Sequence, residues 1–179
     1  MTSYTSVHLS DPEIGVSFPS VSLNQGIYVP TILSKKQVTQ LPSPTNNFSL
    51  KFAKIANLPP HQNHTPYLLY TGYCGVFQVK LNISLQNLDP TSTIADIAFV
   101  IVTGKNSQAP TKIIETTKTA ITVTPNNIVN VSDNALVYLN TCDTVSVYFK
   151  ATPNVSNTGS KTSLSNLKLD SFNLVVESV

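Results

Sequence analysis

Residues 75–88, GVFQVKLNISLQNL, contain the pattern that decides the fold. Large apolar side chains alternate there with polar ones without a break, which is the period of two that a half-buried β-strand shows. The apolar series is Phe77, Val79, Leu81, Ile83 and Leu85. A single sheet does not bury its own face, so such a strand needs a second layer packed against it. We therefore predict a β-protein with two packed sheets.

Similar alternation recurs along most of the chain, with turn signals between the segments and no window of helical period. The further predicted strands include residues 48–55, 94–103, 113–124, 128–131, 135–139, 145–149 and 167–176. Residues 97–102, IAFVIV, are apolar at every position. This predicts a strand in the middle of a sheet, or one that a neighbouring subunit covers. Eight to ten strands at this spacing predict an all-β fold, an antiparallel two-sheet sandwich of the jelly-roll type.

The chain of 179 residues is long enough for one well-buried domain. We predict an extended, proline-rich arm or a set of edge strands over residues 1–46, and one jelly-roll domain over residues 47–179. Prolines at this density prevent a helix and remove donors from a sheet ladder. The candidate contact residues of the arm are Ile14, Val16, Phe18, Ile27 and Val29. They pack either on a neighbouring subunit or as the first strands of the same sandwich.

Charged residues make up 11% of the chain, against about 25% in a typical soluble domain. The net charge of +2 comes from 11 Lys without a single Arg. Recognition of phosphates and bases relies on the guanidinium fork, so we do not expect nucleic-acid binding. The first ten residues lack the apolar segment of a signal peptide, and no apolar run approaches the roughly 20 residues of a membrane span. We expect a protein that is made in soluble form.

No motif in the sequence predicts catalysis, a metal or a cofactor. A nucleophile elbow, a phosphate-binding glycine loop and a zinc-protease helix are all missing. His61 and His64 lie three residues apart, but in a loop flanked by prolines and without further ligands nearby. Cys74 and Cys142 form one disulfide or remain two thiols, and the sequence does not decide between them. We expect no enzymatic activity.

Three of the seven tyrosines cluster around one loop: Tyr67, Tyr70 and Tyr73. A tyrosine has an apolar ring and a polar tip, so a group of them on a loop is typical of a recognition surface or a subunit contact. The alternative is that they pack at the end of the sandwich.

Three segments resemble the C1q and tumour-necrosis-factor type of jelly roll. Residues 71–85, TGYCGVFQVKLNISL, are similar to its glycine-led central strand, and residues 167–178, LKLDSFNLVVES, to its final strand. Residues 135–149, ALVYLNTCDTVSVYF, are similar to the two later strands and the Asp turn between them, although Cys142 stands before Asp143 where that fold usually has Gly. The resemblance implies a trimeric head domain that binds a receptor or a glycan.

The chain also resembles the single jelly-roll proteins of viral capsids and vertices. The shared features are a composition rich in Asn, Ser and Thr, a proline-rich arm and the lack of a catalytic set. This resemblance implies a structural virion protein, with a five-fold vertex (penton) subunit as the leading version. Its partners would be copies of itself, as a pentamer, and other capsid proteins. We expect this function first and the trimeric head second, and a homo-oligomer in both cases.

Overall fold

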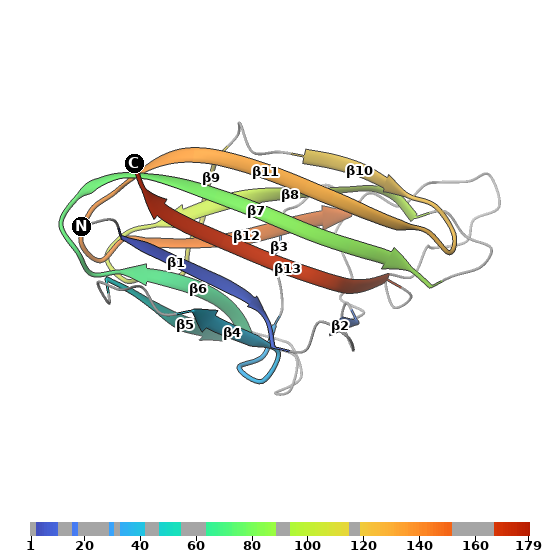
Figure 1. The fold of residues 1–179 in the computed structure, drawn as a ribbon, viewed down its shortest axis with the longest axis horizontal. Coiled ribbons are helices and arrows are strands. Elements are labelled where there is room, and N and C mark those ends of the chain that lie inside the picture. Colours follow the sequence, from blue (N-terminus) through green and yellow to red (C-terminus); the bar gives the residue numbers. More distant parts are fainter. Residues whose placement is uncertain are drawn as a thin grey trace.

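The computed structural model describes residues 3–10, 16–17, 29–30, 33–41, 47–54, 64–88, 94–114, 119–151 and 167–179. These residues contain no helix, and their strands form two antiparallel sheets that pack face to face (Figure 1). The prediction of an all-β sandwich is confirmed. Three of the strands are two-residue pieces, and the other ten match the predicted number of eight to ten. The prediction of two strands over residues 128–131 and 135–139 is wrong, because residues 128–139 pair with β7 without a break and form one strand.

Sheet A has the strand order β11-β7-β13-β1-β4, with β2 beside β13. Its strands are β1 (Tyr4–Leu9), β2 (Val16–Ser17), β4 (Val38–Leu41), β7 (Gly75–Asn87), β11 (Ile128–Leu139) and β13 (Leu167–Ser178). The long strands β7, β11 and β13 run side by side, and both chain termini lie at the same end of the molecule (Figure 1).

Sheet B has the order β10-β8-β12-β6-β5, with β3 beside β12 and β9 beside β8. Its strands are β3 (Val29–Pro30), β5 (Phe48–Lys54), β6 (His64–Tyr70), β8 (Ile94–Gly104), β9 (Lys112–Ile113), β10 (Thr119–Val123) and β12 (Thr144–Ala151). From β6 onwards the chain changes sheet at most connections, which is how a jelly roll brings distant strands together.

The central strand behaves as its alternation predicts. β7 lies between β11 and β13, and its five alternating apolar side chains are at most 2% exposed. They face the apolar side chains of sheet B in one continuous core. At one end of this core the rings of Phe48, Tyr70 and Phe77 pack together, with the Tyr70 centroid 4.8 Å from each of the other two. The Tyr70 and Phe77 rings meet edge to face, and such a contact adds to the stabilisation from burial.

The strand that is apolar on both faces, β8, lies between β10 and β12 in sheet B. Its outward side chains Ala98, Val100 and Val102 are as buried as its core-facing ones. Beside them, the hydroxyls of Thr144 and Tyr148 donate to the carbonyl oxygens of Gln108 and Pro110 on the segment that follows β8. The prediction of a mid-sheet strand is therefore confirmed, and the chain itself covers both faces.

Segments before residue 47 also belong to the sheets. β1 lies between β13 and β4, β2 pairs with Lys168 and Leu169, and β3 pairs with Tyr148 and Phe149. Of the arm residues, Val16 lies in β2 and Val29 in β3, whereas Ile14, Phe18 and Ile27 lie outside the described residues. The boundary at residue 46 and the contact role of these residues stay predictions.

Neighbouring atoms lie so close to Gly104 that a larger residue there is expected to destabilise the fold. A Cβ there would clash with the Thr144 hydroxyl and lie 2.9 Å from both the Gln108 carbonyl oxygen and the Pro110 Cα. We expect Gly104→Ala to lower the free energy of unfolding by about 1–3 kcal/mol, because overpacking moves the backbone. Gly75→Ala is the control, since its Cβ would meet the Phe77 ring at an ordinary 3.5 Å. Urea unfolding of both variants measures the difference, and equal losses would contradict the explanation.

Candidate functional site

Within the described residues, the outward faces of the two sheets differ most along their central strands. The outward side chains of β8 and β12 in sheet B are largely buried. Those of β7 and β11 in sheet A are exposed or half-buried along both strands. The candidate site is therefore the outward face of sheet A, which we call the open face.

An apolar patch lies on the open face where β11 ends and β7 begins. Its members are Val76, Leu136, Tyr138 and Val179, with exposed fractions of 45%, 67%, 58% and 81%. Tyr138 is the cross-strand partner of Val76, and the Val179 backbone N–H donates to the Val76 carbonyl oxygen. Leu136 is two residues before Tyr138 and points to the same side. Exposed side chains that adjoin in this way are typical of an interaction surface.

A second, smaller apolar group lies on the other side of the open face. Tyr4 of β1 is 36% exposed and Leu41 of β4 is 50% exposed. Both lie near Ser6, because Leu41 is its partner in β4 and Tyr4 is two residues before it. The strand order places β13 between this group and the patch strands β7 and β11. The open face thus carries two different apolar groups, one towards each edge of the sheet.

The rest of the open face is mostly polar. Lys80 of β7 forms an ion pair with Glu177 of β13, and Lys168 pairs with Asp170 at 2.9 Å. The remaining outward side chains of β7, β11 and β13 are mostly amides and hydroxyls, and the Ser132 hydroxyl, for example, donates to the Asn82 side-chain oxygen at 2.8 Å. Asp133 of β11 instead accepts a hydrogen bond from the Thr119 hydroxyl at 2.9 Å.

A core tyrosine holds the loop beside the apolar patch. Tyr70 belongs to the aromatic group of the core and donates its hydroxyl to the Tyr73 carbonyl oxygen, which fixes the 71–74 loop. Burial and the nearby Cys74 raise the pKa of Tyr70. Cys74 is exposed, and a hydrogen bond with it raises the pKa of Tyr138 in the patch. Both cysteines are free thiols in the structure, so the described chain has no disulfide between them.

A buried carboxylate ties the neighbouring loops together. Asp143 is 2% exposed and accepts hydrogen bonds from the Asn140 backbone N–H at 2.8 Å and from Lys105. Cys142 before it adopts a left-handed φ of 69°, and its carbonyl oxygen accepts from Ser107. Burial by itself would raise the pKa of Asp143, but the bonds from Lys105 and Asn140 outweigh burial and lower it. The carboxylate is therefore a structural anchor beside the patch.

Removal of this carboxylate has a predictable pH signature. Folding lowers the pKa of Asp143 below its ordinary value of 3.8. The carboxylate therefore stabilises the fold at neutral pH, and this stabilisation is lost as the pH falls from 3.8 through the lowered pKa. We expect Asp143→Asn to lower the free energy of unfolding by about 1–3 kcal/mol at pH 7. The difference from the wild type should shrink at pH 2.5. Urea unfolding at both pH values measures it, and a difference that is the same at both would contradict the assignment.

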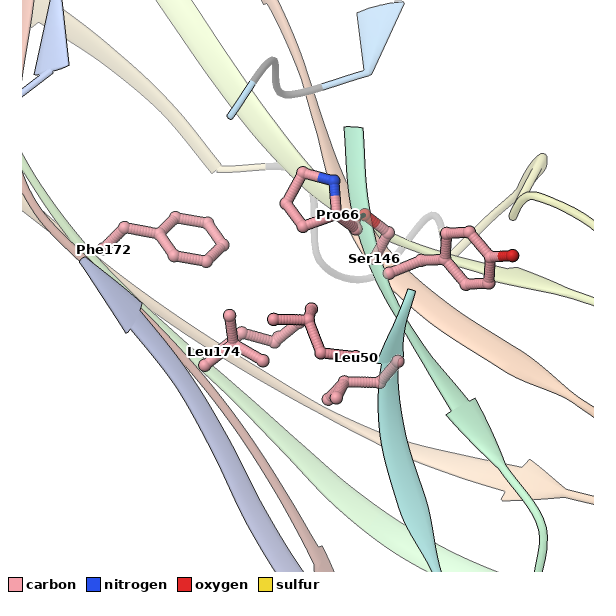
Figure 2. Close-up of a pocket in the computed structure, with 8 residues that line it drawn as sticks. Leu50, Pro66, Ser146, Phe172 and Leu174 are labelled. Atoms are coloured by element: carbon pink, nitrogen blue, oxygen red, sulfur yellow. Dashed lines mark hydrogen bonds between the residues drawn. The ribbon is translucent and has the colours of Figure 1, made fainter. Parts of the chain in front are cut away.

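A small pocket lies where β6 and β12 separate. Pro66 has no N–H to donate, so the ladder with β12 stops at Leu68 and the Ser146 hydroxyl donates to the Pro66 carbonyl oxygen instead. Figure 2 shows Phe172 and Leu174 of sheet A facing Leu50 and Pro66 of sheet B across the gap. The cavity has a volume of about 10 Å³, which is room for about one water molecule. Pockets for small molecules are larger, about 300–1,000 Å³.

The structure places the three predicted contact tyrosines in different surroundings. Tyr70 is buried in the core, Tyr67 is half-buried beside the pocket, and Tyr73 is 91% exposed next to the patch. Sequence reasoning missed the patch residues Leu136 and Tyr138. A signal was present, because residues 135–139, ALVYL, are apolar at outward as well as inward positions. In an edge strand such as β11, that pattern indicates a contact surface.

The described residues were searched for a group of metal ligands and for a membrane-spanning helix. No three His, Cys, Asp or Glu side chains gather among them as metal ligands would. None of the described segments forms a helix that is long and apolar enough to cross a membrane.

Comparisons with known proteins show that this chain is similar in fold to some solved structures. No protein-family model and no curated protein matches the chain. Among solved structures it is similar to murine APRIL at pH 5.0, with a TM-score of 0.49 and 6% identity over 98% of this chain and 99% of that chain. It is also similar to the globular domain of zebrafish complement 1qA, with a TM-score of 0.45 and 10% identity over 100% and 97%. Likeness at this level says nothing about function.

Proposed function

We propose that the chain is a non-enzymatic head domain of the C1q/TNF type, which assembles as a homotrimer through the open face and presents its loops to a binding partner. The observation that carries this proposal is the apolar patch, on a face where Lys80 pairs with Glu177 and Lys168 with Asp170. Exposed apolar side chains that gather in this way are stabilised when a second protein covers them. A copy of the same chain meets little repulsion there, because these four charges are paired.

The open face is about as large as one protein interface. Its five strands have 12, 13, 12, 6 and 4 residues, which at about 3.3 Å per residue and 4.8 Å between strands span roughly 740 Å². Specific interfaces bury about 800 Å² on each partner. Contacts through this face would therefore cover most of it.

The arrangement of the two apolar groups favours a ring. A two-fold contact joins the same patch on both subunits, whereas a ring joins two different patches head to tail. The apolar patch and the group of Tyr4 and Leu41 are two such patches. The resemblance to C1q/TNF jelly rolls implies that the ring has three members. The earlier expectation of a pentameric vertex protein in a virion has no support from the comparisons and stays a prediction.

The loop tips beside the patch supply a surface for a partner. Residues 105–108 are exposed, and the bonds of Asp143 and Cys142 hold this loop in place. Asn106 and Ser107 keep left-handed φ values of 54° and 61°. Such positions cost free energy and are concentrated at functional sites. A receptor or a glycan is the class of partner that the family resemblance implies.

Native mass spectrometry of the full-length protein at pH 7.5 tests the proposal. We expect a main species of three times the subunit mass of 19.4 kDa. A protein that remains monomeric at tens of micromolar would contradict it, and a pentamer would favour the vertex reading instead.

A further inference from the structure

Positive charge is concentrated in one part of the chain. Between Glu13 and Asp89 there is no acidic residue, whereas five lysines occur there. One of them, Lys80, pairs with Glu177 on the open face. The other four are all exposed, and we call them the basic edge: Lys35, Lys36, Lys51 and Lys54.

The fold brings these four lysines to one edge of the sandwich. β4 and β5 are the end strands of sheets A and B, and they lie beside each other in Figure 1. The Gln40 side chain joins them, because it donates to the Phe48 carbonyl oxygen at 3.0 Å and accepts from the Leu50 backbone N–H at 2.8 Å. Two lysines of the basic edge belong to β5, and the other two to the turn before β4.

The turn that carries Lys35 and Lys36 has a defined shape. The Ser34 backbone N–H donates to the Gln37 side-chain oxygen at 2.8 Å, and the Gln37 backbone N–H donates to the Ser34 carbonyl oxygen at 3.0 Å. The Lys35 ammonium group lies 5.7 Å from the centre of the Phe52 ring, a distance at which the ring attracts a cation. The turn therefore places positive charge directly beside β5.

The lysines of β5 point to opposite sides of the strand, and a half-buried aromatic ring accompanies each of them. Lys51 is the cross-strand partner of Tyr67. Lys54 is the partner of His64 and lies two residues after Phe52, so it points to the same side as that ring. Tyr67 and Phe52 are both half-buried. The basic edge thus combines charge with apolar surface on each side of β5.

The described acidic residues lie on β11, on β13 and in the turn before β12: Asp133, Asp143, Asp170 and Glu177. The acidic residues nearest to the basic edge along the chain, Asp11 and Glu13, lie outside the described residues. Two carboxylates neutralise at most two of four ammonium groups. The basic edge therefore stays positive even if both of them pair with it.

We infer that the basic edge binds an extended acidic segment of a partner protein, in which carboxylates alternate with apolar side chains. The carboxylates are complementary to the ammonium groups, and the apolar side chains to Tyr67 and Phe52. An extended chain reaches both sides of β5, which a flat membrane surface does not. A sulfated polysaccharide matches the charge but has no apolar side chains. The basic edge is separate from the apolar patch, so the inference stands whether or not the chain forms a trimer.

Fluorescence polarisation of a labelled synthetic peptide with the full-length protein tests the inference. In this peptide Glu alternates with Leu and Ser, and a second peptide has Gln in place of each Glu. We expect the acidic peptide to bind with a micromolar dissociation constant at low salt. The constant should rise at least about tenfold in 300 mM salt, because salt screens exposed charges. The Gln peptide should not bind.

Charge reversals locate the binding surface. Lys51→Glu and Lys54→Glu should each raise the dissociation constant at least about fivefold, and the double variant at least about 30-fold, because each reversed charge repels the peptide. Lys112→Glu, exposed on β9 at the opposite edge of sheet B, is the matched control and should bind as the wild type does. Circular dichroism confirms that every variant is folded.

The remaining outcomes would overturn the inference. One is equal binding of the two peptides, and another is an equal loss in Lys112→Glu and in the variants of β5. Heparin fragments and phosphatidylserine vesicles are measured alongside, and tighter binding of either one with the same dependence on Lys51 and Lys54 would assign the basic edge to that class instead. Native mass spectrometry of each variant shows whether its subunit number changes, which keeps this test separate from that of the proposed function.

Discussion

Replacing Tyr138 with Asp is expected to leave a folded monomer. The side chain lies in the apolar patch, points away from the core and is 58% exposed, so the fold depends little on it. In the assembly, however, an Asp would place an unpaired negative charge inside an apolar contact. Aromatic residues at the centre of interfaces are frequent hot spots, and we expect the dissociation constant to rise at least about 30-fold.

Two further variants make this result specific. Tyr138→Phe keeps the ring and should assemble nearly as the wild type does. Thr111→Asp adds the same charge at an exposed position beside sheet B and should assemble normally. Analytical ultracentrifugation of the three variants gives the subunit number, and thermal unfolding confirms that each is folded. An unchanged assembly of Tyr138→Asp would show that the open face is not the interface.

Replacing Phe77 with Ala is expected to remove a large part of the stability of the domain. Phe77 is 2% exposed and packs edge to face on Phe48, at 5.6 Å between centroids, and on Tyr70. Truncation removes the buried ring and leaves a cavity between the two sheets, which costs about 3–5 kcal/mol in other proteins. Whole domains are stable by only about 5–15 kcal/mol. The free energy of unfolding in urea measures the loss.

The control removes a ring of similar size from the same region of the chain. Tyr73 is 91% exposed, and its contribution to the hydrogen bond with Tyr70 comes from the backbone. Tyr73→Ala should therefore change the free energy of unfolding by no more than about 0.5 kcal/mol. If the two variants lose similar amounts, burial of Phe77 between the sheets is not what stabilises this end of the sandwich.

The strands were predictable because alternation is a local property. The polar and apolar positions of β7 and the doubly apolar β8 follow directly from their sequences, and both predictions are confirmed. The role of β1 was harder to see, since a short strand such as residues 4–9 gains its stability from two partners far along the chain, β13 and β4. Pairing of this kind leaves no local signal.

The candidate site could not be predicted in the same way. Tyr70 and Tyr73 are three residues apart, yet one is buried in the core and the other is exposed, because the chain turns from sheet B to sheet A between them. Val76, Tyr138 and Val179 come together only through the register of three strands.

The sequence by itself determined that this protein is an antiparallel sandwich, because the period of two and the turn residues act within a few residues of one another. It also determined a low charge and the lack of a catalytic motif. The tertiary structure decided which sheet is covered and which is open, and it decided where exposed apolar side chains meet. These properties depend on contacts between residues more than a hundred positions apart, such as Val76 with Val179, and they are fixed only when the sheets close.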